Sequence, residues 1–483
     1  MKTLEKFPTG IAGLDEVLIG GIPKGRSVLV TGETGTGKTV LLNEFIYRGI
    51  TLFNQNAVFV TFEEKPQDIN LNVAIFGWNF ATLIKSHKLA FVDVTASKEM
   101  LTEIGSEFDV SPLVERIRYA VKKVKAQRVA IDNINALFAR FANKDSVRRV
   151  LYLIEEALKE MDVTSMISME VRRDKSNESF YGIEEFVMDG VIELELRQGQ
   201  QQLIRNLFVR KLRGTSFRSG YVEFEIADHG FIVYPKIPAH LISKKTSFKI
   251  RKSTGIRKLD EITGGGVPQG HNILISGNTG TGKTTLGMQF IREGIERGES
   301  GIYVCLEEPV LQVEKTAMGH GWDFGKYEKE GKLKFITTSL IDVSNDKLLY
   351  QIVNAVNAIG AKRLVFDSIS SLMSGTMNEE QVRQFLLQMT AFLKSRGITS
   401  YFNYLSAGNF GAAKGQLLGA FETSAMRLSS VTDGIILLLY VERGQKIKKM
   451  LTVLKLRGSV HDKDIYQYEI CKGGINLGEK FED

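Results

Sequence analysis

A long segment occurs twice in this 483-residue chain. The run TGIAGLDEVLIGGIPKGRSVLVTGETGTGKT begins at Thr9, and TGIRKLDEITGGGVPQGHNILISGNTGTGKT begins 245 residues later, at Thr254. Farther along, KLRG at Lys211 recurs 244 residues later at Lys455. This period is much longer than the roughly 20–50 residues of a solenoid repeat, and the chain is too long for one hydrophobic core. We therefore expect two whole domains of one kind, residues 1–240 and 241–483, joined near residues 238–250.

Each half alternates apolar, strand-like runs with amphipathic helical patterns. A short apolar run precedes each glycine-rich segment, and the helical patterns TVLLNEFIYRGI and TTLGMQFIREGI follow. Two later runs in each half end in polar or acidic residues: AVFVTFEE and RVAIDN, then GIYVCLEE and RLVFDS. This alternation predicts α/β domains, each with a mostly parallel, doubly wound sheet. Ligands of such sheets bind at the carboxyl ends of the strands, where all of these motifs fall.

The glycine-rich segments match the P-loop pattern G-x-x-x-x-G-K-[ST] in both halves, at Gly32–Thr39 and Gly277–Thr284. In a P-loop, backbone N–H groups close around phosphate oxygens, the lysine reaches the terminal phosphates and the hydroxyl binds Mg²⁺. Two matches, each between a strand and a helix, predict two nucleotide sites. The nucleotide-binding residues are expected to be Gly35, Thr36, Gly37, Lys38 and Thr39, and Gly280, Thr281, Gly282, Lys283 and Thr284.

Asp132 and Asp367 end hydrophobic strands. That is the usual position of the acid that holds Mg²⁺ in P-loop proteins, although an aspartate there can also cap a helix. We expect the Mg²⁺ ligands to be Thr39 and Asp132 in the first half and Thr284 and Asp367 in the second.

Paired acids follow the strand after each P-loop helix, at Glu63-Glu64 and Glu307-Glu308. Such a pair can orient and deprotonate a group that attacks the γ-phosphate. A solvated loop pair or a helix cap is the alternative. The recurrence in both halves favours catalytic carboxylates.

The KLRG segments place a lysine and an arginine two residues apart, as Lys211 and Arg213 and as Lys455 and Arg457. Strand alternation turns both side chains to one side, where they can bind nucleotide phosphate as an arginine finger does. A strand edge kept soluble by charge is the alternative.

The apolar runs, the cysteine and histidine content and the net charge limit the classes of protein to which this chain can belong. The N-terminus lacks the apolar core of a signal peptide, and the longest apolar run, Gly434 to Val441, is too short to span a membrane. Two cysteines and six histidines show no metal-ligand spacing, and so few cysteines fit a reducing cytoplasm. The net charge of +7 includes a basic segment at Ser243–Lys258. Because such segments are more often solvated linkers, we do not expect nucleic acid as a partner.

Several motifs together resemble the KaiC circadian-clock ATPase family: the tandem P-loops, FVTFEEKPQDI, CLEE, FYGIEEF, both KLRG segments and GSVHDK. The likeness runs from Thr9 to about residue 482. It implies two tandem RecA-like domains and ATP with Mg²⁺ as cofactors. It also implies a homohexamer of two stacked rings, in which the Lys-x-Arg pair of one subunit completes the neighbour's nucleotide site.

The resemblance gives the two halves different activities, an ATPase in the first and a serine/threonine autokinase in the second. LSSVTDGIILLLY, Leu428–Tyr440, aligns with EEFVMDGVIELEL, Glu184–Leu196. The family's two phosphate acceptors fall on Ser429 and Ser430, where the first half has Glu185 and Phe186. Ser430 replaces the threonine of the clock protein. Serines that only cap or line a strand are the alternative.

Two other function classes stay open: a RecA- or DnaB-like DNA-dependent ATPase, and a scaffold whose ATP binding only drives assembly. The chain ends at Asp483, without the tail that binds KaiA in clock members of the family, which counts against KaiA as a partner. A circadian or a timer or stress role remains open, with a KaiB-like protein or a signalling kinase as partner.

Overall fold

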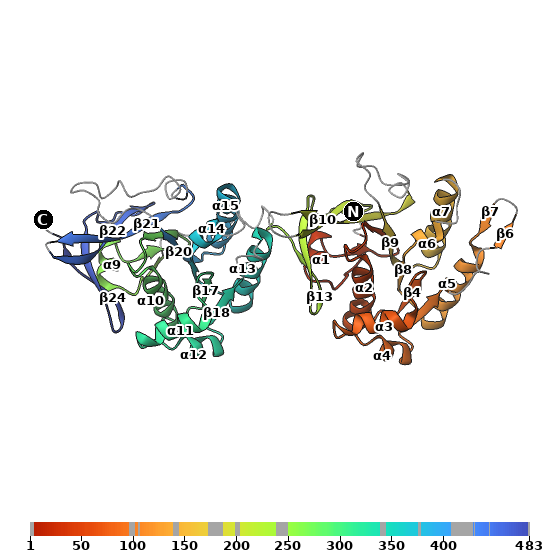
Figure 1. The fold of residues 1–483 in the computed structure, drawn as a ribbon, viewed down its shortest axis with the longest axis horizontal. Helices are drawn as coiled ribbons and strands as arrows, with labels where there is room; N and C mark the ends of the chain where they lie inside the picture. Colours follow the sequence, from red (N-terminus) through yellow and green to blue (C-terminus); the bar gives the residue numbers. More distant parts are fainter. Residues whose placement is uncertain are drawn as a thin grey trace. The chain divides into compact units, whose positions relative to one another are not determined.

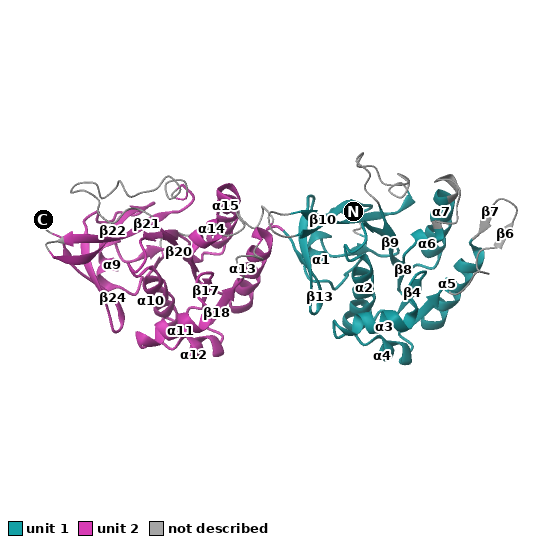
Figure 2. Ribbon diagram, in the orientation of Figure 1, with its two compact units in different colours: residues 1–235 teal, residues 236–483 magenta. Residues whose placement is uncertain are grey.

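The computed structural model describes residues 4–95, 102–104, 107–138, 144–171, 187–198, 203–237, 250–338, 344–374, 378–406, 428, 430–443 and 445–481. The chain divides into two compact units, Met1–Pro235 and Lys236–Asp483 (Figure 2). The boundary expected after residue 240 falls among residues 238–249, outside the described part. Within that part, no helix is long and apolar enough to cross a membrane.

The first unit contains a nine-stranded sheet with the order β13-β12-β11-β10-β3-β9-β8-β4-β5. Its strands are β3 (Ser27–Gly32), β4 (Ala57–Thr61), β5 (Leu89–Asp93), β8 (Arg128–Asp132), β9 (Thr164–Glu170), β10 (Gly190–Gln198), β11 (Leu203–Leu212), β12 (Val222–Ala227) and β13 (Gly230–Tyr234). The six strands from β10 to β5 are parallel, and β11 to β13 extend the sheet in antiparallel fashion. Two small pairs lie outside it: β1 (Lys6–Phe7) with β2 (Ile22–Pro23), and β6 (Thr102–Ile104) with β7 (Glu107–Asp109).

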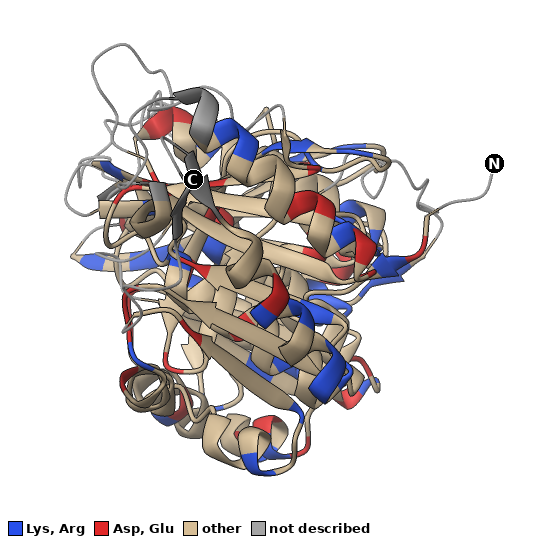
Figure 3. Cartoon of the chain, turned by 90° about the vertical axis from the view of Figure 1, so that its right-hand side faces the viewer, with Lys and Arg blue, Asp and Glu red and all other residues tan. Residues whose placement is uncertain are grey.

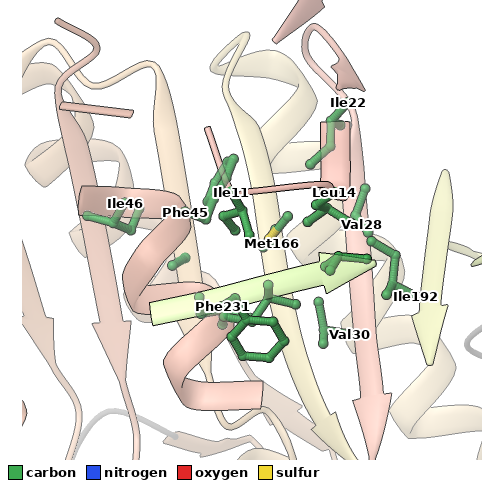
Figure 4. Close-up of a cluster of buried hydrophobic side chains, with 14 of the residues drawn as sticks. Ile11, Leu14, Ile22, Val28, Val30, Phe45, Ile46, Met166, Ile192 and Phe231 are labelled. Carbon is green, nitrogen blue, oxygen red and sulfur yellow. The ribbon is translucent and has the colours of Figure 1, made fainter. Parts of the chain in front are cut away.

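Helices of the first unit cover both faces of this sheet. They are α1 (Leu14–Val17), α2 (Lys38–Phe53), α3 (Pro66–Ala74), α4 (Phe80–Lys85), α5 (Ser111–Val124), α6 (Asn135–Phe138) and α7 (Lys144–Glu160). Alternate residues of β3 enter different cores: Val28 and Val30 pack with α2, whereas Leu29 packs with α5 and α7. The central strands are therefore buried on both faces, which explains their nearly continuous apolar sequence. Figure 4 shows the core on the α2 side, with Phe45 and Ile46 beside the strand residues.

The second unit repeats this topology, with the order β18-β17-β19-β20-β16-β21-β22-β23-β24 (Figure 1). Its strands are β16 (Asn272–Gly277), β17 (Gly301–Cys305), β18 (Leu333–Thr337), β19 (Arg363–Asp367), β20 (Thr399–Leu405), β21 (Gly434–Arg443), β22 (Lys446–Leu456), β23 (Tyr466–Cys471) and β24 (Gly474–Lys480), with the separate pair β14 (Arg251–Lys252) and β15 (Val267–Pro268). Its helices are α9 (Arg257–Ile262), α10 (Lys283–Glu296), α11 (Val310–Gly319), α12 (Phe324–Lys329), α13 (Asn345–Ile359), α14 (Ile369–Ser374) and α15 (Glu379–Ser395). The prediction of two α/β domains, each with a mostly parallel sheet, is confirmed.

Candidate nucleotide sites

In each unit, the P-loop joins a buried central strand to a long helix. β3 ends at Gly32 and α2 begins at Lys38, and the second copy repeats this between β16 and α10. Gly37 has a φ of 104° and Gly282 a φ of 95°, in the left-handed region that favours glycine. A Cβ at Gly37 would lie 2.7 Å from the Ile226 side chain. Each loop therefore holds a helix N-terminus at the carboxyl edge of its sheet, an arrangement suited to phosphate.

The P-loop lysines lie against their own loops. Lys38 Nζ donates hydrogen bonds to the carbonyl oxygens of Gly32 and Glu33, both at 2.9 Å. Lys283 Nζ donates to Gly277 at 2.8 Å and to Asn278 at 3.0 Å. Burial lowers the pKa of both ammonium groups, and nearby carboxylates oppose that shift. The lysine positive charge is thus held at the loop in both copies.

The expected Mg²⁺ ligands come together in both units. In the second unit, Thr284 Oγ1 donates to Asp367 Oδ2 at 2.8 Å. In the first, the Thr39 hydroxyl bonds to Asp132, whose pKa is raised because the carboxyl is buried. Hydroxyl and carboxylate oxygens at the edge of a P-loop form the donor set that Mg²⁺ takes with nucleotide phosphates. The side chains present therefore fit this ion.

The structure separates the members of the first glutamate pair. The carboxyl of Glu63 faces Asp132, which, like Asp367 of the second unit, is called the metal acid here because it is the expected acidic ligand of Mg²⁺. Desolvation and then the charges of Asp132, Glu170 and Glu64 raise the pKa of Glu63. The Glu64 carboxylate instead accepts a hydrogen bond from Asn72 of α3 at 3.1 Å. Of the two, Glu63 is the one placed to act on a group near the P-loop.

In the second unit, hydroxyl groups surround the corresponding glutamate. Ser371 Oγ donates to Glu307 Oε1 at 2.8 Å, and the Ser368 hydroxyl bonds to the same oxygen. Desolvation and the charges of Asp367 and Glu307 raise the pKa of Glu308. Both glutamates of this pair lie beside the metal acid.

Glu170 belongs to the first site, although it was not among the site residues expected from the sequence. It ends β9 and pairs in register with Gly32 of the P-loop, and its carboxylate accepts a hydrogen bond from Thr34 at 2.6 Å. Its charge also opposes the lowering of the Lys38 pKa. An acid at the end of an apolar strand was a detectable signal, but its relevance depends on β9 being the neighbour of β3.

The Lys-x-Arg pairs lie at the edge of each sheet formed by the amino ends of the parallel strands. The P-loops lie at the opposite edge, formed by the carboxyl ends. Lys211 is level with Val191, which pairs with Leu29, whereas the P-loop begins three residues farther along, at Gly32. That spacing is roughly 10 Å of strand. The Lys211 ammonium donates to the Met188 carbonyl at 2.8 Å, before β10 begins. The pair is therefore not brought to the P-loop of its own unit.

The second unit places Lys455, Arg457 and Ser430 together at the same edge. Lys455 Nζ donates to the Thr432 carbonyl at 2.9 Å, and Arg457 Nη2 to the Ser430 carbonyl at 3.3 Å. Ser430 is exposed and precedes β21. Ser429, like Glu185 and Phe186 of the first copy, lies outside the described residues. Ser430 is thus at the far edge from the P-loop of its own unit.

A known protein family matches this chain twice, once in each of its two units. The family described as ATPase: KaiC matches residues 7–237 and again residues 252–482. The chain is 35% identical to the circadian clock oscillator protein KaiC of Thermostichus vulcanus, over 99% of this chain and 90% of that protein. It is 37% identical to the protein of the same name from Prochlorococcus marinus subsp. pastoris, over 99% and 92%. It is 35% identical to the circadian clock oscillator protein KaiC 1 of Synechocystis sp., over 100% and 91%. The two tandem RecA-like domains are confirmed, and the chain belongs to the KaiC ATPase family.

Proposed function

We propose that this protein hydrolyses ATP in its first copy and phosphorylates Ser429 and Ser430 with its second copy, across subunit boundaries of a two-ring homohexamer. The observation that carries the proposal is the placement of two sets of groups at opposite edges of each sheet. The P-loop, the metal acid and the glutamates occupy one edge, and Lys-x-Arg with Ser430 the other. A complete site then requires two chains.

In the first site, Glu63 is proposed as the general base. Its carboxylate would take a proton from water while the water oxygen bonds to the γ-phosphorus and the bond to the leaving oxygen of ADP breaks. Thr39 and Asp132 would hold Mg²⁺, which neutralises charge on the phosphate oxygens when bound. Lys38 from the same chain and Lys211 with Arg213 from a neighbour would hold the phosphates.

In the second site, the attacking group is the hydroxyl of Ser430 or Ser429 from a neighbouring subunit. Glu307 or Glu308 would take the hydroxyl proton while the serine oxygen bonds to the γ-phosphorus and ADP leaves. Thr284 and Asp367 would hold Mg²⁺. The exposed position of Ser430 beside Arg457 supports this assignment, because the product phosphoserine would lie next to a cation.

The biological role proposed is that of a circadian clock component or of a related timer or stress signal. The names of the relatives support it. Partners are expected to be other copies of this chain, with a KaiB-like protein or a signalling kinase as reader of the phosphate mark. A cytoplasmic location is proposed from the cysteine content.

A DNA-dependent ATPase is the competing function, and the basic excess of the chain is the feature in its favour. Figure 3 shows lysine and arginine interspersed with acidic residues over the elements in view, which favours the protein-directed activity. The turnover rate decides between them, since a rate raised strongly by single- or double-stranded DNA would support the DNA-dependent enzyme.

Intact-mass measurement after incubation with ATP and Mg²⁺ tests the proposal. We expect added phosphate, located at Ser429 or Ser430 by peptide mapping and absent from Lys283→Ala and from the Ser429→Ala/Ser430→Ala variant. The Lys38→Ala variant keeps the second site intact. It serves as the matched control under conditions in which it still forms the hexamer. Unmodified mass in the wild-type protein, with ATP turnover present, would leave a tandem ATPase without kinase activity.

A further inference from the structure

The metal acid of the second unit has a hydrogen-bond partner with no counterpart in the first unit. The Tyr303 hydroxyl donates to Asp367 Oδ2 at 2.8 Å, the oxygen that also accepts from Thr284. Tyr303 is fully buried in β17, and its neighbour Cys305, two residues along the strand, pairs with Asp367. Alternation in the strand puts Tyr303 on the face from which its phenol reaches the carboxylate.

The first unit supports its metal acid from the other side. Phe59 occupies the place of Tyr303: it pairs with Ala130, two residues before Asp132, as Tyr303 pairs with Val365. Phenylalanine has no hydroxyl to donate. Instead, the Ser168 hydroxyl of β9 bonds to Asp132 Oδ1. A neighbouring strand supplies a hydroxyl in both units, but it is a different strand.

The second unit has an asparagine where the first has Ser168. Ser168 pairs with Val30, and Asn403 pairs with the equivalent Ile275. Asn403 is fully buried, and neither atom of its amide finds a hydrogen-bond partner among the described residues. The donor to the metal acid has therefore moved from β9 in the first unit to β17 in the second.

We propose that Tyr303 is the positioning residue that orients Asp367 toward Mg²⁺ in the second nucleotide site, as Ser168 orients Asp132 in the first. This inference rests on the proposed binding of nucleotide with Mg²⁺ at that site. A hydroxyl that donates to a carboxylate oxygen holds that carboxylate in one orientation, and partners of this kind commonly set the metal affinity of the ligand that they hold.

The test uses the full chain with Lys38→Ala, so that the second P-loop dominates the signal. Binding of fluorescent N-methylanthraniloyl-ADP is followed while Mg²⁺ is titrated. We expect Tyr303→Phe to raise the Mg²⁺ concentration at half-maximal effect about tenfold, with nucleotide binding in EDTA unchanged. The thermal unfolding midpoint is recorded for every variant, because a fold defect would lower it.

Two further variants make the result specific. Tyr401→Phe also removes a buried phenol hydroxyl, one that has no hydrogen-bond partner among the described residues, and should leave the Mg²⁺ titration unchanged. Tyr303→Phe/Asn403→Ser installs the pair found in the first unit. It should return the half-maximal Mg²⁺ concentration most of the way to the parental value.

Three results would overturn the inference. The first is a Tyr303→Phe titration equal to that of the parent, which leaves Mg²⁺-dependent binding and the proposed function intact. The second is an equal loss in Tyr401→Phe. The third is a loss that Asn403→Ser does not repair in a protein that unfolds at the parental temperature. If the parent itself shows no Mg²⁺-dependent nucleotide binding, the proposed function of the second site fails as well.

Discussion

The two copies of one fold surround their glutamates with different chemical groups. In the first, Glu63 lies near the carboxylates of Asp132 and Glu170 and accepts a hydrogen bond from the Asn133 amide at 3.5 Å. In the second, Glu307 accepts hydrogen bonds from the hydroxyls of Ser368 and Ser371. The position of Glu170 is taken by Leu405, since both residues pair in register with the first glycine of a P-loop.

This difference fits the two reactions proposed for the two copies of one framework. Like charges and desolvation make the Glu63 carboxylate a stronger base, as a group that must deprotonate water requires. Two hydroxyl donors hold the Glu307 carboxylate, whereas an amide donor, Asn133, contacts Glu63. The loops and strands that carry these residues are the same, so the two copies differ by a few side chains at the strand ends.

The two copies also differ around a buried arginine that lies against each P-loop helix. Arg128 donates to the Gln55 side chain at 2.7 Å and to backbone carbonyls, and desolvation lowers its pKa to about 10. Arg363 occupies the same place but forms an ion pair at 2.7 Å with Glu299, whose other carboxylate oxygen pairs with Lys252. The arginine thus packs in the same place in both units, but only in the second unit does a carboxylate of the described residues bind it.

The largest effect is expected at Glu63. Glu63→Gln removes the proposed base and should reduce turnover of the first site about 100- to 10,000-fold, measured as ATPase rate in the Lys283→Ala protein. Glu64→Gln should cost much less, because that carboxylate is turned toward Asn72. Equal losses would mean that the two acids act together and that their different surroundings have no functional meaning.

The next effect concerns stability. Arg363→Met removes one of the two cations that pair with the partly buried Glu299 and leaves it with Lys252 alone. It should lower the free energy of unfolding of the second unit by about 1–3 kcal/mol. Arg128→Met leaves only neutral partners behind, and its cost should be clearly smaller. Denaturant unfolding of both variants gives the comparison. A larger cost for Arg128→Met would show that the ion pair is not the source of the difference.

Exchange of the arginine partner should have a milder effect. Glu299→Gln gives the second unit the residue that the first has at Gln55, and keeps a hydrogen-bond acceptor for Arg363. We expect a loss of about 1 kcal/mol in the free energy of unfolding. The reverse change, Gln55→Glu, is the matched control and should stabilise the first unit or leave it unchanged.

The smallest effect is a shift in pH dependence. A base must be deprotonated, so the rate at the first site falls as the pH drops through the pKa of Glu63. Glu170→Gln removes one of the charges that raise this pKa and should move the acid limb of the pH–rate profile to lower pH. Glu16→Gln, an exposed acid elsewhere in the unit, should not move it. A shift to higher pH would contradict the electrostatic explanation.

The sequence was sufficient for features carried by local patterns. The P-loops, the strand-ending Asp132 and Asp367, and the α/β class follow from motifs and apolar periodicity within short windows. Glu170, Ser168 and Tyr303 could not be found that way, because their importance depends on strand order and on which side chains face one carboxylate. The same holds for Lys211 and Arg213, whose distance from the P-loop depends on the register of β11, β10 and β3.

Transfer between subunits is the central claim, and a mixing experiment tests it most directly. Lys283→Ala chains keep Ser429 and Ser430 but lack the second P-loop lysine. Ser429→Ala/Ser430→Ala chains keep the lysine but lack the acceptors. With ATP and Mg²⁺, neither should become phosphorylated alone, whereas phosphate should appear on the Lys283→Ala chains in the mixture, as read by peptide mass spectrometry. Wild-type protein that phosphorylates itself while the Lys283→Ala chains stay unmodified in exchanged, mixed rings would contradict the claim.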